Sequence, residues 1–153
     1  MLRILLVEDN PADAQMLRTA LGKTGLPVEI THLRDGVEAV EYLASEQKPA
    51  KCCDVVLLDL NLPRLNGFEV LEQIRSCEEL KSLPVVIMSG SSNADEIDHC
   101  YQAGANSYIC KPIHLDEILA TAAWFVAYWS NCVKLPRRSE GSSALNCLAA
   151  AQK

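Results

Sequence analysis

The sequence lacks an apolar stretch of the roughly 20 residues that a membrane-spanning helix needs, although 49% of its 153 residues are hydrophobic. It also lacks the features of a secretory signal peptide, because Met1 leads directly into the apolar run 4–7 without a small-residue cleavage site. Both absences predict a cytoplasmic protein that does not enter the membrane.

Positive charge is scarce as well. The 14 Lys and Arg side chains are outnumbered by 20 Asp and Glu, which gives a net charge of −6. A nucleic-acid-binding surface needs clustered Lys and Arg, and the main basic cluster, at Lys134, Arg137 and Arg138, is small. The residues after Val133 are also too few for an appended DNA-binding domain. We therefore expect no nucleic-acid partner.

Cysteine spacings typical of metal sites are absent. None of the seven cysteines belongs to a C-x-x-C motif, and Cys52 and Cys53 are adjacent, which is a poor geometry for a bridge. These spacings argue against zinc and structural disulfides, and they predict free thiols in a reducing compartment.

Five short apolar runs alternate with stretches of helical periodicity. We predict strands at 4–7, 28–33, 54–58, 85–88 and 107–110, with helices at 11–21, 36–44, 68–74, 94–103 and 115–133. This alternation is typical of an α/β protein with a parallel sheet and helices on both faces. Short right-handed connections favour the flavodoxin-like (βα)5 order 2-1-3-4-5. We expect one domain over residues 1–136 and a mobile tail over 137–153.

Charged residues directly follow three of the predicted strands. Glu8 and Asp9 follow the first, Asp59 the third and Lys111 the fifth. The carboxyl ends of neighbouring parallel strands share one crevice, where ligands bind. Three carboxylates there would repel one another unless a cation held them, and oxygen ligands suit a hard ion such as Mg²⁺. A nearby lysine suits a phosphoryl group. The sequence therefore predicts a site that handles phosphate and a metal ion.

Four motifs together resemble the CheY-like receiver domain of response regulators in two-component signalling. They are V-E-D-N at 7–10, L-L-D-L-N-L-P-R-L-N-G at 57–67, M-S-G-S-S at 88–92 and Y-I-C-K-P at 108–112. The resemblance covers about residues 1–125, and four motifs in this order are far more specific than any one of them. It implies a phospho-accepting switch with a sensor histidine kinase as its partner.

The resemblance also implies roles for the acidic residues. Asp59 corresponds to the phospho-accepting aspartate, and Asp9 to a direct Mg²⁺ ligand. Glu8 stands where many members carry Asp, and its extra methylene favours a contact to the ion through water. Asp59 and the backbone carbonyl of Asn61 would complete the protein's share of the ligands.

The remaining family positions are those of the switch. Lys111 would pair with Asp59 at rest and with the phosphoryl group afterwards, and the resemblance implies a cis peptide bond between Lys111 and Pro112. Ser89 corresponds to the switch hydroxyl and Tyr108 to the switch aromatic.

Water attack on the phosphorylated form is expected to be slow. Asn61 and Ser91 flank the path of the attacking water in the family, and neither an amide nor a hydroxyl is an efficient base. The protein is thus expected to be a switch with slow self-dephosphorylation and no enzyme. A pseudo-receiver that binds partners without phosphorylation is one alternative. An aspartate-nucleophile phosphohydrolase is another, although such enzymes carry a second Asp where this chain has Asn61.

The last helix presents two apolar faces. We assign its core stripe to Leu115, Ile118, Leu119, Ala122, Phe125, Val126 and Trp129. At about 100° per residue, Trp124 and Tyr128 point away from that stripe, with Ala120 at their border. This second face predicts a homodimer through the last helix.

The W-F-x-x-Y-W ending at 124–129, the K-L-P that follows it and the loop 47–53 resemble the small receivers associated with cyanobacterial phytochromes. This closer resemblance implies that the partner kinase is light-regulated.

Overall fold

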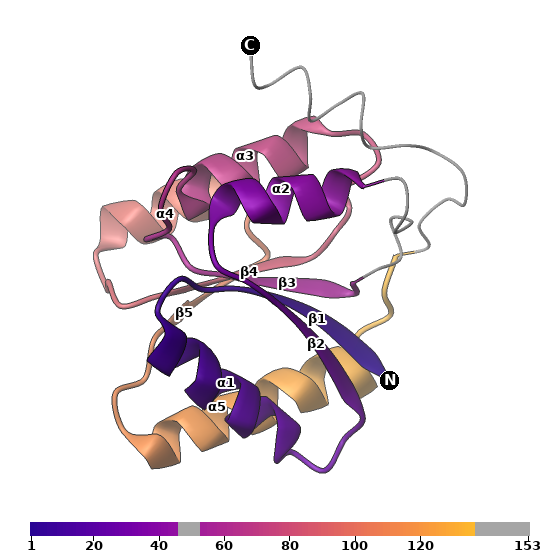
Figure 1. The fold of residues 1–153 in the computed structure, drawn as a ribbon, viewed down its shortest axis with the longest axis vertical. Helices are drawn as coiled ribbons and strands as arrows, with labels where there is room; N and C mark the ends of the chain where they lie inside the picture. Colours follow the sequence, from indigo (N-terminus) through magenta and orange to yellow (C-terminus); the bar gives the residue numbers. More distant parts are fainter. Residues whose placement is uncertain (46–52, 137–153) are drawn as a thin grey trace.

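Residues 1–45 and 53–136 are described by the computed structural model, and within them five parallel strands form one sheet (Figure 1). The predictions for most of the loop 47–53 and for the tail 137–153 lie outside the described residues. The strands are β1 (Leu2–Val7), β2 (Val28–Leu33), β3 (Val55–Leu58), β4 (Val85–Ser89) and β5 (Ser107–Cys110). Their order is β2-β1-β3-β4-β5, which confirms the predicted flavodoxin-like topology.

Helices cover both faces of this sheet. They are α1 (Pro11–Gly22), α2 (Gly36–Ala44), α3 (Gly67–Ser76), α4 (Ala94–Gln102) and α5 (Leu115–Ala127). α1 and α5 lie on one face, and α2, α3 and α4 on the other (Figure 1). Among the described residues, no helix combines the length and the apolar character needed to cross a bilayer.

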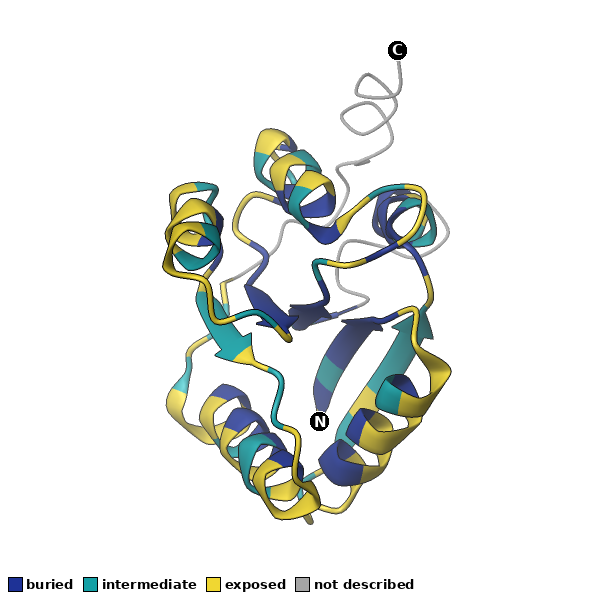
Figure 2. Cartoon of the chain, turned by 90° about the vertical axis from the view of Figure 1, so that its left-hand side faces the viewer, coloured by how far each residue is buried: buried dark blue, intermediate teal, exposed yellow. Residues whose placement is uncertain are grey.

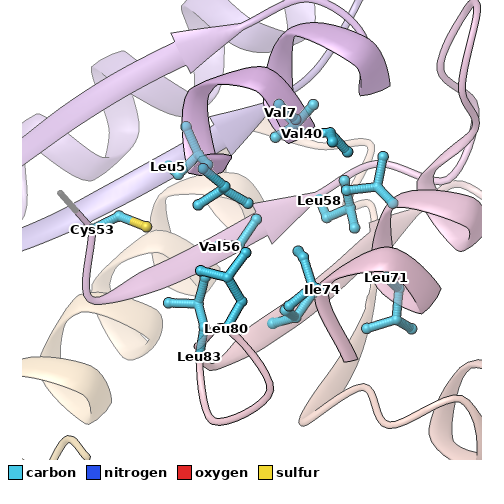
Figure 3. Packing of buried hydrophobic residues seen from close by; sticks show 14 of the residues in the cluster. Leu5, Val7, Val40, Cys53, Val56, Leu58, Leu71, Ile74, Leu80 and Leu83 are labelled. Atoms are coloured by element: carbon cyan, nitrogen blue, oxygen red, sulfur yellow. The ribbon is translucent and has the colours of Figure 1, made fainter. Parts of the chain in front are cut away.

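The core consists of two layers, one on each face. The strands β1, β3 and β4 are almost entirely buried, and the edge strands β2 and β5 are less so (Figure 2). Side chains alternate between the faces, so Leu5, Val56 and Leu58 pack under α2 and α3 (Figure 3). Ile4 and Leu57 point the other way, into the layer under α1 and α5. The continuous apolar runs in the sequence reflect this burial on both sides.

Side-chain caps start the helices soon after the strands end. The Asn10 side chain accepts hydrogen bonds from the backbone N–H groups of Ala12 and Asp13, at 2.9 and 3.2 Å. Asn66 and Glu69 form a reciprocal capping box at the start of α3. The start of α3 lies close to the end of β3, and this requires glycine at position 67, because a Cβ there would lie 2.0 Å from the carbonyl oxygen of Asp59. These local features fix the loops that carry the charged residues.

The predicted extension of the last helix is confirmed over residues 115–132, although two details differ from the prediction. The α-helix ends at Ala127 and is followed by a π-helical turn, η1 (Tyr128–Cys132), instead of continuing to 133. Leu115 is 63% exposed and Leu119 is also exposed, so their assignment to the core stripe is wrong. Leu115 has the right phase but lies in the first turn of the helix, and Leu119 lies on the flank of the stripe.

Candidate functional site

The three predicted carboxylates meet at the carboxyl edge of the sheet. One oxygen each from Glu8, Asp9 and Asp59 can lie within 4.8 Å of the others. β1 pairs directly with β3, with Val7 beside Leu58, so the residues that follow these strands are neighbours. The Asp59 N–H also donates to the carbonyl oxygen of Val7 at 3.0 Å, which keeps the two strand ends in register.

Asp59 is buried and held by two donors. Its Oδ1 accepts a hydrogen bond from the backbone N–H of Asn61 at 3.1 Å, and its Oδ2 accepts one from Lys111 Nζ at 2.7 Å. Fixed donors orient the carboxylate and hold it at the edge of the sheet.

Glu8 is even more deeply buried, with 1% of the residue exposed. Its Oε2 lies 2.6 Å from Lys111 Nζ, and its Oε1 accepts from the backbone N–H of Asn10 at 3.1 Å. Burial raises the pKa of Glu8, and the negative charge of Asp59 adds to this, while the hydrogen bond from Lys111 opposes it. The carboxylate is therefore paired but costly to ionise.

Lys111 lies between the carboxylates. Besides Glu8 and Asp59, its Nζ lies 3.4 Å from an oxygen of Asp13 in the first turn of α1. Burial lowers the pKa of Lys111, but the hydrogen bonds and charges of Asp59 and Glu8 raise it overall, so the side chain stays cationic. Asp13 was not among the predicted site residues, although its position one turn into α1 is a signal that could have indicated it.

The donor set fits a divalent cation. Three carboxylates face one ammonium group, which leaves an excess of negative charge at a site built from oxygen atoms. Asp9, unlike Glu8 and Asp59, is exposed and gives the cluster an open side toward solvent. Hard oxygen donors of this kind suit Mg²⁺ or Mn²⁺.

Ser89 and Tyr108 are joined by a residue that sequence reasoning missed. Glu96 Oε1, in the first turn of α4, accepts hydrogen bonds from the Tyr108 hydroxyl at 2.6 Å and from Ser89 Oγ at 3.4 Å. The Tyr108 hydroxyl also lies 3.0 Å from the Ser91 carbonyl oxygen. Burial raises the pKa of Tyr108 to about 12, and the hydrogen bond to Glu96 contributes. In the sequence, Glu96 stands three residues after the cap Asn93, a spacing that indicates helix capping and not this contact.

The Lys111–Pro112 prediction is wrong. Every peptide bond in the described residues is trans, including this one. The two isomers before proline differ by only about 0.5–1 kcal/mol, so the sequence does not decide between them. Lys111 Nζ reaches Asp59 and Glu8 with the bond trans, and the Lys111 backbone N–H donates to the Ser89 carbonyl oxygen at 2.7 Å.

The second face of the last helix is exposed, as its phase indicates. Trp124 is 73% exposed and Tyr128 is 55% exposed, and Ala120 is half-buried beside them. Both rings line a groove of about 810 Å³ that also includes Pro84 and Ile109. Among the cysteines that the structure describes, Cys100, Cys110 and Cys132 are free thiols.

Together, a flavodoxin-like fold and an acidic pocket with a lysine define the class of the protein. Residues 4–123 match the response regulator receiver domain, and the chain belongs to that family.

Two proteins of similar sequence match most of this chain. Response regulator Rcp1 of Synechocystis sp. is 34% identical over 135 residues, which are 87% of this chain and 92% of Rcp1. The probable methanogenesis regulatory protein FilR2 of Methanothrix harundinacea is 38% identical over 127 residues, or 82% of each chain.

Two solved structures are also similar. The phosphorylated cyanobacterial phytochrome response regulator RcpA has 40% identity and a TM-score of 0.81, over 88% of this chain and 98% of RcpA. The Mn²⁺-bound form of Rcp1 has 32% identity and a TM-score of 0.78, over 90% of this chain and 100% of Rcp1. The chain is thus related to phytochrome-associated regulators, as its C-terminal motifs indicate.

Proposed function

We propose that this protein is a two-component response regulator that accepts a phosphoryl group on Asp59. The observation that carries the proposal is the position of Asp59, a buried carboxylate 2.7 Å from Lys111 Nζ within a cluster of acidic residues. Receiver domains in general are signalling switches, so the proposed outcome is a change of state and not catalytic turnover.

The phosphoryl donor is a phosphohistidine of a sensor kinase. An oxygen of Asp59 attacks the phosphorus, a P–O bond forms as the P–N bond breaks, and the imidazole nitrogen keeps the electron pair. Because a carboxylate attacks an anion here, neutralising charge is the main requirement. Lys111 supplies one positive charge at a fixed position and can follow the phosphoryl group after transfer.

The proposed cofactor is Mg²⁺. Asp9, Asp59 and the backbone carbonyl of Asn61 would hold it directly, and Glu8 through water. When bound, the ion neutralises the phosphoryl oxygens and orients the donor. The Mn²⁺-bound form of Rcp1 supports a divalent ion in this kind of pocket.

After transfer, the signal passes through the switch residues. The Ser89 hydroxyl, at the end of β4, can turn toward a phosphoryl oxygen, and Tyr108 is coupled to it because both side chains bind Glu96. Asn61 and Ser91 can orient water without accepting its proton, so we expect a long-lived acyl phosphate.

The proposed kinase is light-regulated, by analogy with the relatives named for phytochrome. Such a kinase takes its phosphate from ATP, which places the exchange in the cytoplasm. Residues 1–136 would act as one receiver domain that signals through protein contacts, without nucleic acid or membrane.

We further propose a homodimer through α5. The exposed rings of Trp124 and Tyr128 line an apolar groove, and burying each such ring contributes about 1.5–3 kcal/mol. A two-fold axis lets one patch cover its own copy. Sedimentation should show a dimer at micromolar concentration, and Trp124→Glu with Tyr128→Glu should give folded monomers that still accept phosphate. A wild-type monomer would instead assign this face to another partner.

The central test uses a small phosphodonor with Mg²⁺ and a gel that retards phosphoproteins. Wild type should shift to one modified species and Asp59→Asn should not, with Asp54→Asn as the matched control far from the site. A shift that persists in Asp59→Asn would refute the assignment. No shift in wild type would indicate a pseudo-receiver, and sustained hydrolysis of a phosphate ester would indicate a phosphohydrolase.

A separate experiment compares how much Asp9 and Glu8 contribute to Mg²⁺ binding. Asp9→Asn should weaken Mg²⁺ binding more than Glu8→Gln in a calorimetric titration, because only Asp9 is proposed to bind the ion directly. Equal losses would mean that both residues bind it directly.

A further inference from the structure

The loop between β3 and α3 contains an unusual backbone conformation. Arg64 has φ 65°, and it is the one non-glycine residue with positive φ in the described part of the chain. A residue with a Cβ is disfavoured in this left-handed region. Such a conformation persists only where the surroundings hold it, and it is common at functional sites.

The contact that holds Arg64 is an ion pair with the neighbouring loop. Its Nε donates to Asp35 Oδ2 at 3.0 Å, and its Nη2 donates to the same oxygen. Asp35 also caps α2, because its Oδ1 accepts from the backbone N–H of Glu38 at 2.9 Å. Burial raises the pKa of Asp35, but the hydrogen bonds from Glu38 and Arg64 outweigh it and lower the pKa overall. Asp35 is therefore a charged anchor at neutral pH.

A second contact joins the same two loops. A Cβ on Gly36 would lie only 2.0 Å from the carbonyl oxygen of Leu65, so the loops touch where Gly36 has no side chain. We use the name clasp for the Asp35–Arg64 ion pair together with this Gly36–Leu65 contact. The clasp ties the tip of the β3–α3 loop to the start of α2.

This loop is the one that leaves the phosphorylation site. It begins at Asp59, whose Oδ1 is bound by the Asn61 N–H, and it is closed by a hydrogen bond of 2.9 Å from the Gly67 N–H to the Leu60 carbonyl oxygen. Asn61 lies three residues before Arg64. Fixing the tip of so short a closed loop therefore limits how far the Asn61 peptide can rotate.

We propose that Arg64 and Asp35 are positioning residues that hold the Asn61 carbonyl ready to bind the divalent cation. The inference rests on the proposed function, since Asn61 is a ligand only in a receiver that binds the ion. Neither side chain touches the site, so the effect is preorganisation. If the clasp is lost, the binding-competent loop becomes a fraction of the population and the apparent Kd rises by the inverse of that fraction, by about three- to tenfold.

The experiment is a Mn²⁺ titration followed by electron paramagnetic resonance, with thermal unfolding of each metal-free variant beside it. Asp35→Asn keeps a good helix cap but removes the charge, and it should raise the Mn²⁺ Kd about three- to tenfold. Arg64→Gly removes the ion pair and the backbone strain, so it should raise the Kd without lowering the Tm as much as Arg64→Ala. The Mn²⁺ Kd of Arg64→Lys should lie between those of wild type and Arg64→Ala, because a point charge replaces the guanidinium fork.

Arg34→Gln is the matched control, since Arg34 is an exposed cation one residue before Asp35 and should not affect the Kd. A Kd equal to wild type in both Asp35→Asn and Arg64→Gly, even with a lowered Tm, would mean that the clasp only stabilises the fold, and it would overturn the inference alone. Wild type that binds no Mn²⁺ would overturn the proposed function and the inference with it.

Discussion

The carboxyl ends and the amino ends of the strands form two opposite edges of the sheet. Each of these edges holds a partly buried cation, but different groups surround the two cations. At the carboxyl edge, Lys111 Nζ is bound by the carboxylates of Glu8 and Asp59. At the amino edge, the Arg75 guanidinium donates to three backbone carbonyls and to Asn106 Oδ1, over 2.8–3.1 Å. Burial lowers the pKa of Arg75, whereas the neighbouring carboxylates raise that of Lys111.

The difference separates stability from function. The carbonyls around Arg75 are neutral and belong to the turns that enter β4 and β5, so this cation connects parts of the fold. The groups around Lys111 carry more negative charge than it can neutralise. Such a surplus is tolerated at a site that binds a cation and a phosphoryl group, and it costs stability when these are absent.

The largest loss of stability is expected when the cation at the amino edge is removed. Arg75→Ala leaves several turn carbonyls without their donor and should lower the free energy of unfolding by about 2–4 kcal/mol. Urea unfolding followed by circular dichroism measures this, with the exposed Arg18→Ala as control. At urea concentrations below its unfolding midpoint, Arg75→Ala should accept phosphate as wild type does. A loss equal to that of Arg18→Ala would mean that Arg75 is not a structural element.

Asp54 gives the amino edge a pH dependence. Burial raises its pKa, but hydrogen bonds from Arg3 outweigh this, and the pKa lies below its ordinary value of 3.8. A lowered pKa stabilises the fold above pH 3.8, and the contribution is lost as the pH falls through the folded value. Asp54→Asn should lose about 1.5 kcal/mol at pH 7, and its stability curve should converge with wild type below pH 4. Parallel curves across that range would contradict this.

Glu8 should give stability the opposite pH dependence to that of Asp54. Its raised pKa means that the protonated form favours folding below the ordinary value of 4.5, and that this contribution is lost as the pH rises through the folded value. At pH 7 in the absence of metal, Glu8→Gln should therefore stabilise the fold by about 1 kcal/mol. Calorimetry in a chelator measures it, and added Mg²⁺ should favour wild type. Destabilisation in the chelator would show that the pairing with Lys111 outweighs the burial.

The smallest effect is expected at the switch. The phenol of Tyr108 should ionise near pH 12, and its contribution to stability should be present below pH 10.0 and lost as the pH rises toward 12. Tyr108→Phe should cost about 0.5 kcal/mol at pH 7, because Glu96 can turn to water. Glu96→Gln should lower the pKa of Tyr108 in an ultraviolet titration. An unchanged pKa of Tyr108 in this variant would mean that Glu96 does not couple to Tyr108.

The order of the strands in the sheet and the location of the site could be predicted from the amino-acid sequence. Continuous apolar runs identify strands buried on both faces, and the caps Asn10 and Asn66 mark helix starts at the strand ends. Because parallel strands end at one edge, Glu8, Asp9, Asp59 and Lys111 could be brought together from strand boundaries alone. These properties are local, and local patterns are sufficient to predict them.

Contacts between distant segments could not be predicted in this way. Glu96 binds Tyr108 across 12 positions, and Arg64 binds Asp35 across 29. No periodicity encodes such pairs, because each depends on how two loops or helices meet. The exposure of Leu115, in the first turn of α5, also depends on packing, and the trans bond before Pro112 depends on a small energy difference settled by its surroundings. Sequence periodicity fixes which face of an element is apolar, whereas packing decides which polar side chains meet.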